Sequence, residues 1–246
     1  MNNSLQTMYI EMVEKALDRY VSTQRCNNDH VLEAMRYSVL GGGKRIRALL
    51  VLNFNRILGG AANDAMEFDA LQTLSFETLA RNTSLEPAQV LQAVRELAAA
   101  AGSRGMVGGQ TVDIEGTAQT VEQLTGMCMM KTGALIKCAV RLGCLSVGAD
   151  EASMAQADIY ADAIGLAFQI RDDILDVIGS TEELGKPVGS DAEQQKATFA
   201  TVLGTERAQS LAEKLTRTAL DALKQLNVAE DDPLYEMTVE LCSRKK

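Results

Sequence analysis

Three carboxylates stand close together inside an otherwise apolar segment, at Asp172, Asp173 and Asp176. Around them, apolar residues recur at spacings of three and four, which is the period of a helix with one buried stripe. On that helix, Asp172 and Asp176 share a face and Asp173 lies one position round. The predicted stripe comprises Ile159, Ala163, Leu166, Ala167, Ile170, Ile174 and Val177.

Like charges at this spacing repel one another and are costly beside an apolar stripe, and a divalent cation removes that cost. Mg²⁺ suits such a position, because it takes one or two carboxylates together with substrate phosphates and water. A solvated acidic face is the plain alternative, since three carboxylates alone define no chemistry. Further along the chain, a glycine-containing loop carries Lys186 and Lys196. Carboxylates followed by two lysines suit a pyrophosphate held through Mg²⁺ and ammonium groups.

The composition favours an all-α protein. Ala, Leu, Glu, Gln, Met and Lys, all good helix formers, dominate the 246 residues, and only three prolines occur. Segments of β-branched residues with a period of two are scarce. Because the chain contains no low-complexity linker and no repeat of fixed period, we expect one domain of antiparallel helices spanning residues 1–246.

The charge and the cysteines limit the possible partners and surroundings. The formal net charge of −9 argues against nucleic acid or an anionic membrane as a partner. Five cysteines form no C-x-x-C pair, which is typical of reduced thiols in a cytosolic protein, most of them in the core. We see no signal peptide and no apolar stretch long enough to span a bilayer, so we expect a cytoplasmic protein without a stable membrane anchor.

Glycine-rich segments occur at two other places. Gly41-Gly42-Gly43 ends one predicted helix, and Lys44, Arg45 and Arg47 open the next, where backbone N–H groups and the helix N-terminus favour an anion. The spacing is not that of a Walker loop, and a basic turn is often only surface. We interpret the second segment, residues 105–110, as a flexible junction between helices.

Five motifs follow one another in an order that resembles the trans-isoprenyl diphosphate synthases, closest to the bacterial short-chain farnesyl and geranylgeranyl diphosphate synthases. The likeness runs from about Leu32 to Lys246, and the ordered set is far more specific than any one piece. The motifs are Gly41-Gly42-Gly43-Lys44-Arg45-Ile46-Arg47, Gly108-Gly109-Gln110, Lys131-Thr132-Gly133-Ala134-Leu135-Ile136, Phe168-Gln169-Ile170-Arg171-Asp172-Asp173-Ile174-Leu175-Asp176 and Gly185-Lys186-Pro187.

The resemblance implies an all-α bundle around a central cavity (the isoprenoid synthase fold), a homodimer and a requirement for Mg²⁺. It implies that Asp172, Asp173 and Asp176 ligate Mg²⁺ on an allylic diphosphate. Contacts to that diphosphate would come from Lys131, Thr132, Gln169, Lys186 and Lys196, with Lys131, Asp172 and Lys186 as the catalytic residues. Lys44 and Arg47 would contact isopentenyl diphosphate.

One departure from the family matters. The family carries a first aspartate-rich motif, D-D-x-x-D or a longer form, followed by R-R-G, with a histidine upstream. These should fall between Gly60 and Asp69, where this chain has Ala61-Ala62-Asn63-Asp64-Ala65-Met66-Glu67-Phe68. Either the residues printed here are joined across a gap, or the protein lacks half of its metal site. We favour a missing segment between about 60 and 69, because deleting core helices would leave costly cavities.

The implied function is condensation of isopentenyl diphosphate with an allylic diphosphate, with farnesyl diphosphate as the expected product and geranylgeranyl diphosphate as the next choice. Two alternatives remain. One is a non-catalytic homologue that acts as the partner subunit of an active synthase. The other is a class I terpene cyclase, against which the segment from Gly41 to Arg47 argues, because a cyclase has no second diphosphate to hold.

Overall fold

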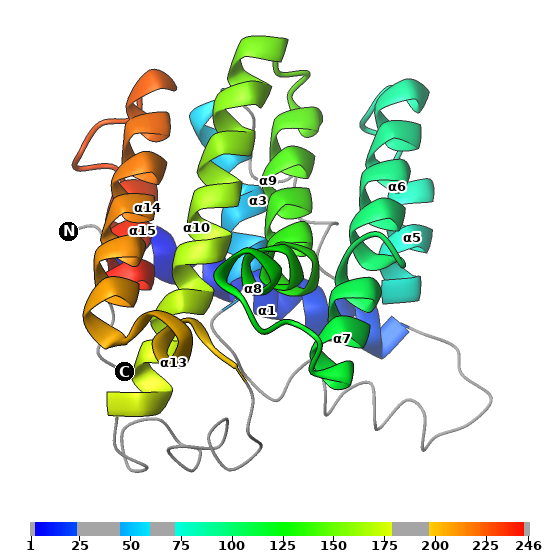
Figure 1. Ribbon diagram of the computed structural model, residues 1–246. Coiled ribbons are helices and arrows are strands. Elements are labelled where there is room, and N and C mark those ends of the chain that lie inside the picture. Colours follow the sequence, from blue (N-terminus) through cyan, green and yellow to red (C-terminus); the bar gives the residue numbers. More distant parts are fainter. Residues whose placement is uncertain (1–2, 24–44, 60–71, 179–196, 244–246) are drawn as a thin grey trace. The chain divides into compact units, whose positions relative to one another are not determined.

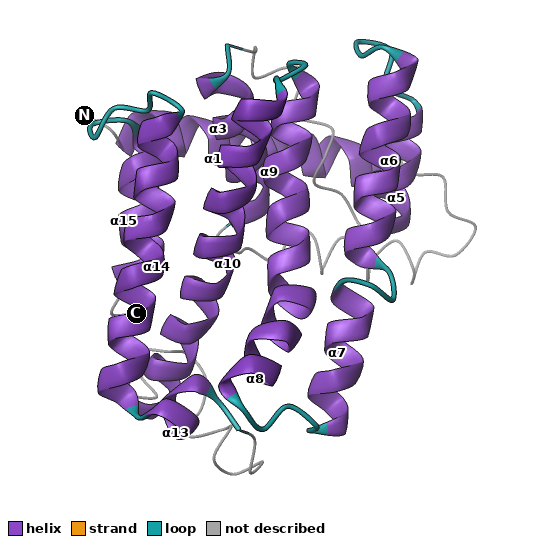
Figure 2. Ribbon diagram, turned by 45° about the horizontal axis from the view of Figure 1, so that its top comes forward, coloured by secondary structure: helices purple, strands orange, loops and turns teal. Residues whose placement is uncertain are grey.

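The structure, a computed structural model, describes residues 3–23, 45–59, 72–178 and 197–243 (Figure 1). Every regular element in these four ranges is helical, and Figure 2 shows the same ranges as helices joined by loops. The prediction of an all-α protein is therefore confirmed. The expected gap between about 60 and 69 lies outside the described residues.

The described residues form two compact units, and each unit draws on two separate stretches of sequence. Unit 1 comprises residues 1–98 and 138–154, and unit 2 comprises residues 99–137 and 155–246. The sequence contains no linker between them, which is why it suggests one domain. The single domain over residues 1–246 stays a prediction.

Unit 1 is organised around a helix that is buried on all sides. Its elements are α1 (Asn3–Thr23), α3 (Ile46–Ile57), α5 (Gln72–Ala80) and most of α6 (Pro87–Ala101) and α9 (Ala134–Ser146). All residues of α3 from Ala48 to Asn55 are buried. A Cβ added at Gly143 of α9 would lie 2.7 Å from the carbonyl oxygen of Val51, so only glycine allows this approach of the two backbones. The buried Asn55 amide donates to Ser146 Oγ at 2.8 Å.

The spacing of apolar residues predicts a first helix from about Leu5 to Val21, and α1 covers this range but turns a different face inward. The periodicity selects Met8, Met12 and Ala16, with Tyr20 beyond them. In the structure, Tyr9, Val13, Ala16 and Leu17 are buried, whereas the Met8 side chain is 45% exposed. The predicted stripe is thus rotated by about one residue, because methionine and valine occur on both sides of it and hydrophobicity alone does not choose between them.

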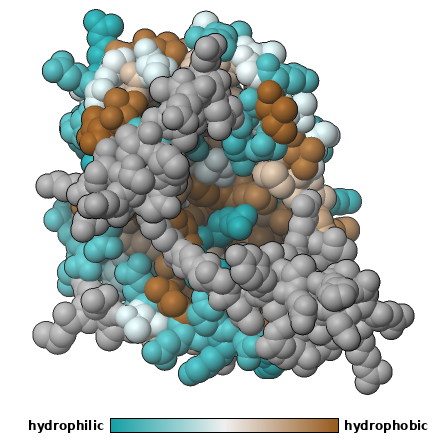
Figure 3. Space-filling view, turned by 90° about the horizontal axis from the view of Figure 1, so that it is seen from below, coloured by the Kyte–Doolittle hydropathy of each residue, from teal (hydrophilic) through white to brown (hydrophobic). Residues whose placement is uncertain are grey.

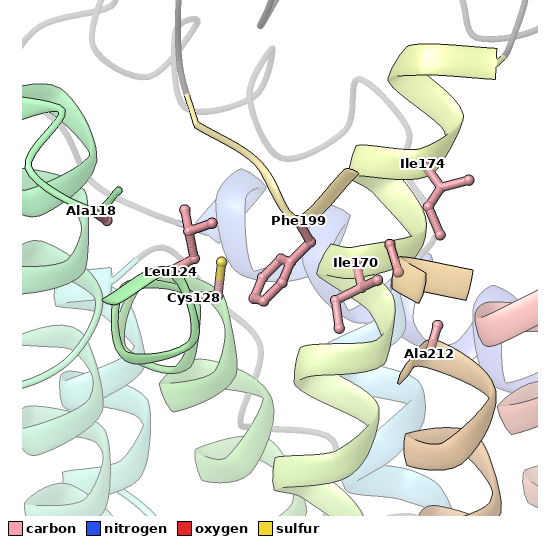
Figure 4. Packing of buried hydrophobic residues seen from close by; sticks show 8 residues of the cluster. Ala118, Leu124, Cys128, Ile170, Ile174, Phe199 and Ala212 are labelled. Carbon is pink, nitrogen blue, oxygen red and sulfur yellow. The ribbon is translucent and has the colours of Figure 1, made fainter. Parts of the chain in front are cut away.

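Unit 2 packs a hydrophobic cluster between helices that are far apart in sequence. Leu124 and Cys128 come from α8, Ile170 and Ile174 from the central helix α10, and Phe199 from the start of α13. Figure 4 shows the Phe199 ring lying between Cys128 and Ile170. Burying such a side chain fully contributes about 1.5–3 kcal/mol each. The elements of this unit are α7 (Met106–Glu115), α8 (Val121–Cys128), the π-helical turn η2 (Met129–Gly133), α10 (Glu151–Ile178), α13 (Phe199–Leu203), α14 (Thr205–Gln225) and α15 (Pro233–Ser243), with α14 packed beside α15.

The helix around the three carboxylates is confirmed, and most of its predicted stripe is correct. Ala163, Ala167, Ile170 and Ile174 are all buried. The two ends of the stripe are not: Ile159 is 44% and Val177 is 50% exposed. Tyr160 and Ile164 are buried as well, so the inward face of α10 is broader than a single stripe.

The interpretation of residues 105–110 as a flexible junction is wrong. Met106 to Glu115 form α7, and the glycines serve close packing. A Cβ at Gly108 would lie 2.0 Å from the carbonyl oxygen of Ser103, and one at Gly109 would lie 2.3 Å from the backbone nitrogen of Lys131. A glycine cluster in sequence does not distinguish a mobile loop from a helix that lies against another backbone.

The cysteines agree with the prediction of buried thiols. Among the described residues, Cys128, Cys138, Cys144 and Cys242 are buried and form no disulfide. Within the four described ranges, no helix is long and apolar enough to cross a membrane. Figure 3 shows a face on which hydrophilic and hydrophobic residues are mixed, with uncertain residues in grey over part of it.

Candidate functional site

The three carboxylates lie on the C-terminal half of α10 and have different surroundings. Asp172 is partly exposed, whereas Asp173 and Asp176 are 7% and 3% exposed. Asp173 accepts hydrogen bonds from within unit 2 on both oxygens. Its Oδ2 accepts from the backbone N–H of Phe199 at 2.9 Å, and its Oδ1 accepts from Gln169 Nε2 at 3.1 Å.

Gln169 connects these carboxylates to the turn that carries Lys131 and Thr132. The Thr132 hydroxyl donates to Gln169 Oε1 at 3.3 Å, and Gln169 in turn donates to Asp173. The approach of the two backbones is close, since a Cβ at Gly165 of α10 would lie 3.1 Å from the Cα of Gly133. The structure therefore brings together Thr132, Gln169 and Asp173, three residues that the sequence places in two separate motifs.

Lys131 lies in the π-helical turn η2, between α8 and α9. Its Nζ is 2.7 Å from Asp113 Oδ2 of α7, and the two side chains are 36% and 14% exposed. π-helical turns occur frequently at functional sites because the wider turn re-aims the residues that it carries. The spacing of Met127, Met130 and Leu135 predicts one unbroken helix here, so the sequence indicates neither the π turn nor the ion pair.

The residues fit a metal ion held jointly with a substrate rather than a closed protein cage. No group of three metal-ligating side chains converges in the ranges that the structure describes. Asp173 is buried and accepts hydrogen bonds from Gln169 and Phe199, whereas Asp172 is the more exposed of the two carboxylates. This arrangement suits Mg²⁺, which is commonly bound through one or two carboxylates while substrate phosphates and water complete its shell.

Two basic residues at the start of α3, Arg45 and Arg47, have different surroundings. Arg45 pairs with Glu14 of α1 at 2.6 Å and has a positive φ of 50°. Arg47 is exposed on the first turn of α3, whose N-terminus has no side-chain cap. The N-terminus of a helix and an exposed guanidinium together suit an anion. Lys44, Lys186 and Lys196 lie outside the described residues, so their assignments stay predictions.

Two further residues of unit 2 have surroundings that the sequence does not indicate. Arg171 is buried, and its Nη1 donates to Gln209 Oε1 of α14 at 2.7 Å. Burial, followed by the nearby charge of Asp173, raises the pKa of the Cys128 thiol to about 12. That thiol therefore stays protonated near neutral pH, which is typical of a buried structural cysteine.

A family model described as Polyprenyl synthetase matches residues 64–236. Farnesyl diphosphate synthase of Escherichia coli (strain K12) is 34% identical over 267 residues, covering 88% of this chain and 89% of the relative. The heterodimeric geranylgeranyl pyrophosphate synthase large subunit 1 of Arabidopsis thaliana is 32% identical over 288 residues, covering 96% and 77%. Both alignments are longer than the 246-residue chain, so each relative contains aligned residues that have no counterpart here.

A solved structure also matches. The geranyltransferase of Helicobacter pylori, complexed with magnesium and isoprenyl diphosphate, is 25% identical, with a TM-score of 0.77 and coverage of 98% of this chain and 96% of that one. The all-helical elements, the ordered motifs and these matches agree with one another. The chain belongs to the polyprenyl synthetase family, the trans-isoprenyl diphosphate synthases, and has their isoprenoid synthase fold.

Proposed function

We propose that this chain transfers a short prenyl group from an allylic diphosphate to isopentenyl diphosphate. The observation that carries the proposal is the hydrogen-bonded series Thr132, Gln169 and Asp173, which links the lysine-bearing turn to the acidic segment of α10. Lys131, one residue before Thr132, supplies a cation, and Asp172, one residue before Asp173, supplies a partly exposed carboxylate. A diphosphate needs both kinds of group, because its charge is shared between ammonium ions and a bound metal.

The chemistry assigns a role to each side chain. Lys131 and Thr132 hold the diphosphate and neutralise the charge that develops on it as its bond to the allylic carbon breaks. Mg²⁺ bound at Asp172, with Asp176 on the same helix face, would make the diphosphate a better leaving group. The double bond of isopentenyl diphosphate then forms a bond to the allylic carbon, and a proton leaves. The departing diphosphate accepts that proton.

Arg47 belongs to the second substrate in this proposal. An exposed guanidinium on the first turn of α3 suits the diphosphate of isopentenyl diphosphate, and Lys44 precedes it in the same motif. Lys186 and Lys196 complete the set of allylic contacts by family likeness. Asp173, which the family resemblance implies as a further Mg²⁺ ligand, also holds Gln169 and the start of α13 in place.

For the product, we propose farnesyl diphosphate, with geranylgeranyl diphosphate as the second choice. The E. coli relative is named for the first product and the Arabidopsis relative for the second. We further propose a homodimer and dependence on Mg²⁺, which is present in the complex of the H. pylori relative.

A non-catalytic partner subunit is the second candidate. Two observations favour it: the first aspartate-rich motif is absent before Asp69, and the relatives contain aligned residues that this chain lacks. One of those relatives is itself the large subunit of a heterodimer.

One experiment distinguishes an active synthase from a non-catalytic partner subunit. The purified chain is incubated with Mg²⁺, dimethylallyl diphosphate and isotope-labelled isopentenyl diphosphate, and the hydrolysed products are separated by chain length. Synthase activity predicts labelled farnesol from the chain alone. A partner subunit predicts no product alone, together with an altered rate or chain length when an active synthase of the family is added.

A further inference from the structure

Helix α7 presents two residues, one turn apart, to the turn that carries Lys131. Gly109 and Asp113 are spaced i and i+4, so they share a face of the helix. A Cβ at Gly109 would meet the backbone of Lys131, and Asp113 pairs with the ammonium group at the end of the Lys131 side chain. Helix α7 therefore contacts both the backbone and the ammonium group of Lys131.

The contact at Gly109 controls where the backbone of Lys131 lies. An added Cβ would come within 2.3 Å of the Lys131 nitrogen, 2.7 Å of its Cα and 2.8 Å of its Cβ. No side chain can be accommodated at such distances unless α7 or η2 moves. Alanine at Gly109 would therefore shift the lysine while leaving its charge unchanged.

The contact at Asp113 controls where the ammonium group lies. The Nζ to Oδ2 distance is 2.7 Å, and Asp113 is the more buried partner. Such an ion pair contributes little to folding, since partly exposed pairs are screened by water. Its larger effect is to restrict a side chain with four rotatable bonds to one direction. The charges of Asp173, Lys131 and Asp113 all act on the Cys128 thiol, so the three groups lie in one small region of unit 2.

We propose that Gly109 and Asp113 are positioning residues, through which α7 holds the Lys131 ammonium group in the position where it binds the allylic diphosphate. The role toward the diphosphate rests on the proposed function, whereas the positioning of Lys131 by α7 does not. When the diphosphate enters, its oxygens compete with Asp113 for the protons of Lys131. Asp113 thus keeps the ammonium group in position between catalytic cycles.

The test compares Asp113→Asn with Asp162→Asn. Asp162 pairs with Lys137 at 2.8 Å in the same unit, so it provides a lysine–aspartate pair of matched length away from Lys131. A second comparison sets Gly109→Ala against Gly126→Ala, since a Cβ at Gly126 meets nothing within 4 Å. Asp113→Glu tests rescue, because it keeps the charge at a slightly different reach.

Two readouts are measured on each full-length variant. The first is the rate at which an amine-reactive reagent labels Lys131, followed by peptide mass spectrometry, and it requires no enzymatic activity. The second is steady-state kinetics with dimethylallyl and isopentenyl diphosphates. Thermal unfolding accompanies both, so that a variant that fails to fold is recognised and the others are used in its place.

The proposal predicts that Asp113→Asn speeds labelling of Lys131 about threefold, the change typical of losing a partly exposed ion pair. It also predicts that kcat falls about tenfold, while the KM for isopentenyl diphosphate stays within about twofold, because misplacing one catalytic group mainly affects the chemical step. Asp113→Glu should recover part of kcat. Asp162→Asn and Gly126→Ala should match the wild type in both readouts.

Unchanged labelling of Lys131 in Asp113→Asn would overturn the proposal that α7 positions Lys131, whatever the kinetics. Faster labelling with unchanged kcat would overturn the role in catalysis. If the wild type forms no prenyl product at all, the proposed function fails, and the labelling comparison still decides whether α7 holds Lys131.

Discussion

The carboxylate of Asp173 on α10 accepts a 2.9 Å hydrogen bond from the backbone N–H of Phe199, 26 residues further along the chain. Phe199 is the first residue of α13, and its fully buried ring packs in the hydrophobic cluster of unit 2. One carboxylate of the acidic motif therefore holds the first residue of α13 against α10.

This relationship separates two substitutions that the sequence alone predicts to behave alike. Asp173→Ala removes the acceptor for Phe199 N–H and for Gln169 Nε2, which costs about 1–3 kcal/mol for buried groups left without these bonds. We expect the melting temperature to fall by several degrees in thermal unfolding monitored by circular dichroism. Asp172→Ala serves as the matched control, since its carboxylate reaches solvent and its loss relieves like-charge repulsion. An equal change in both variants would contradict the anchoring role of Asp173.

Substitution of Arg47 should affect only one of the two substrates. Arg47→Ala removes an exposed guanidinium at the start of α3, and losing a charge-assisted hydrogen bond typically weakens binding about tenfold or more. We therefore expect the KM for isopentenyl diphosphate to rise by that factor, while the KM for dimethylallyl diphosphate stays the same. Arg81→Ala, which removes an exposed arginine paired with Glu77, is the control. A similar rise in both KM values would argue against two separate diphosphate sites.

Alkaline pH should destabilise the fold through its buried thiols. Burial raises the pKa of Cys128 from 9.0 to about 12, so the folded state keeps a proton that the unfolded state releases above pH 9. The stabilisation is complete below pH 9 and is lost as the pH rises toward 12. At pH 10 each such thiol lowers the free energy of unfolding by up to about 1.4 kcal/mol.

Urea unfolding at pH 8 and pH 10 checks this prediction. The loss of stability between the two pH values should be smaller in Cys128→Ala than in the wild type, whatever the cost of the substitution itself. Cys138 has its pKa raised to about 12 for the same first cause and remains as an internal comparison. An identical loss in both proteins would show that Cys128 does not contribute.

Local periodicity predicted the helices well, because an apolar residue every three or four positions is a property of one segment alone. It predicted the inward face less well. Met8 and Ile159 are as hydrophobic as the residues beside them, and only the packing of other helices determines which side is covered. Helix α7 shows the same limit, since the requirement for glycine at position 109 comes from Lys131, which lies 22 residues away in sequence.

The site could be predicted as a set of residue types, but not as a set of contacts. The motifs identify Lys131, Thr132, Gln169 and Asp172, and the structure brings Thr132 to Gln169 and Gln169 to Asp173. Asp113 was missed because a single aspartate on a helix is usually solvated. Its importance appears only when the π turn places a lysine against it.

Prenyl transfer by this chain alone is the central claim, and a paired assay of the wild type and Asp172→Ala tests it most directly. Both proteins are purified in the same way and incubated with Mg²⁺, dimethylallyl diphosphate and labelled isopentenyl diphosphate. We predict a labelled farnesyl product from the wild type and a rate at least about 100-fold lower from Asp172→Ala, the scale on which removing one preorganised electrostatic group acts. No product from the wild type, or an equal rate from both proteins, would contradict the account.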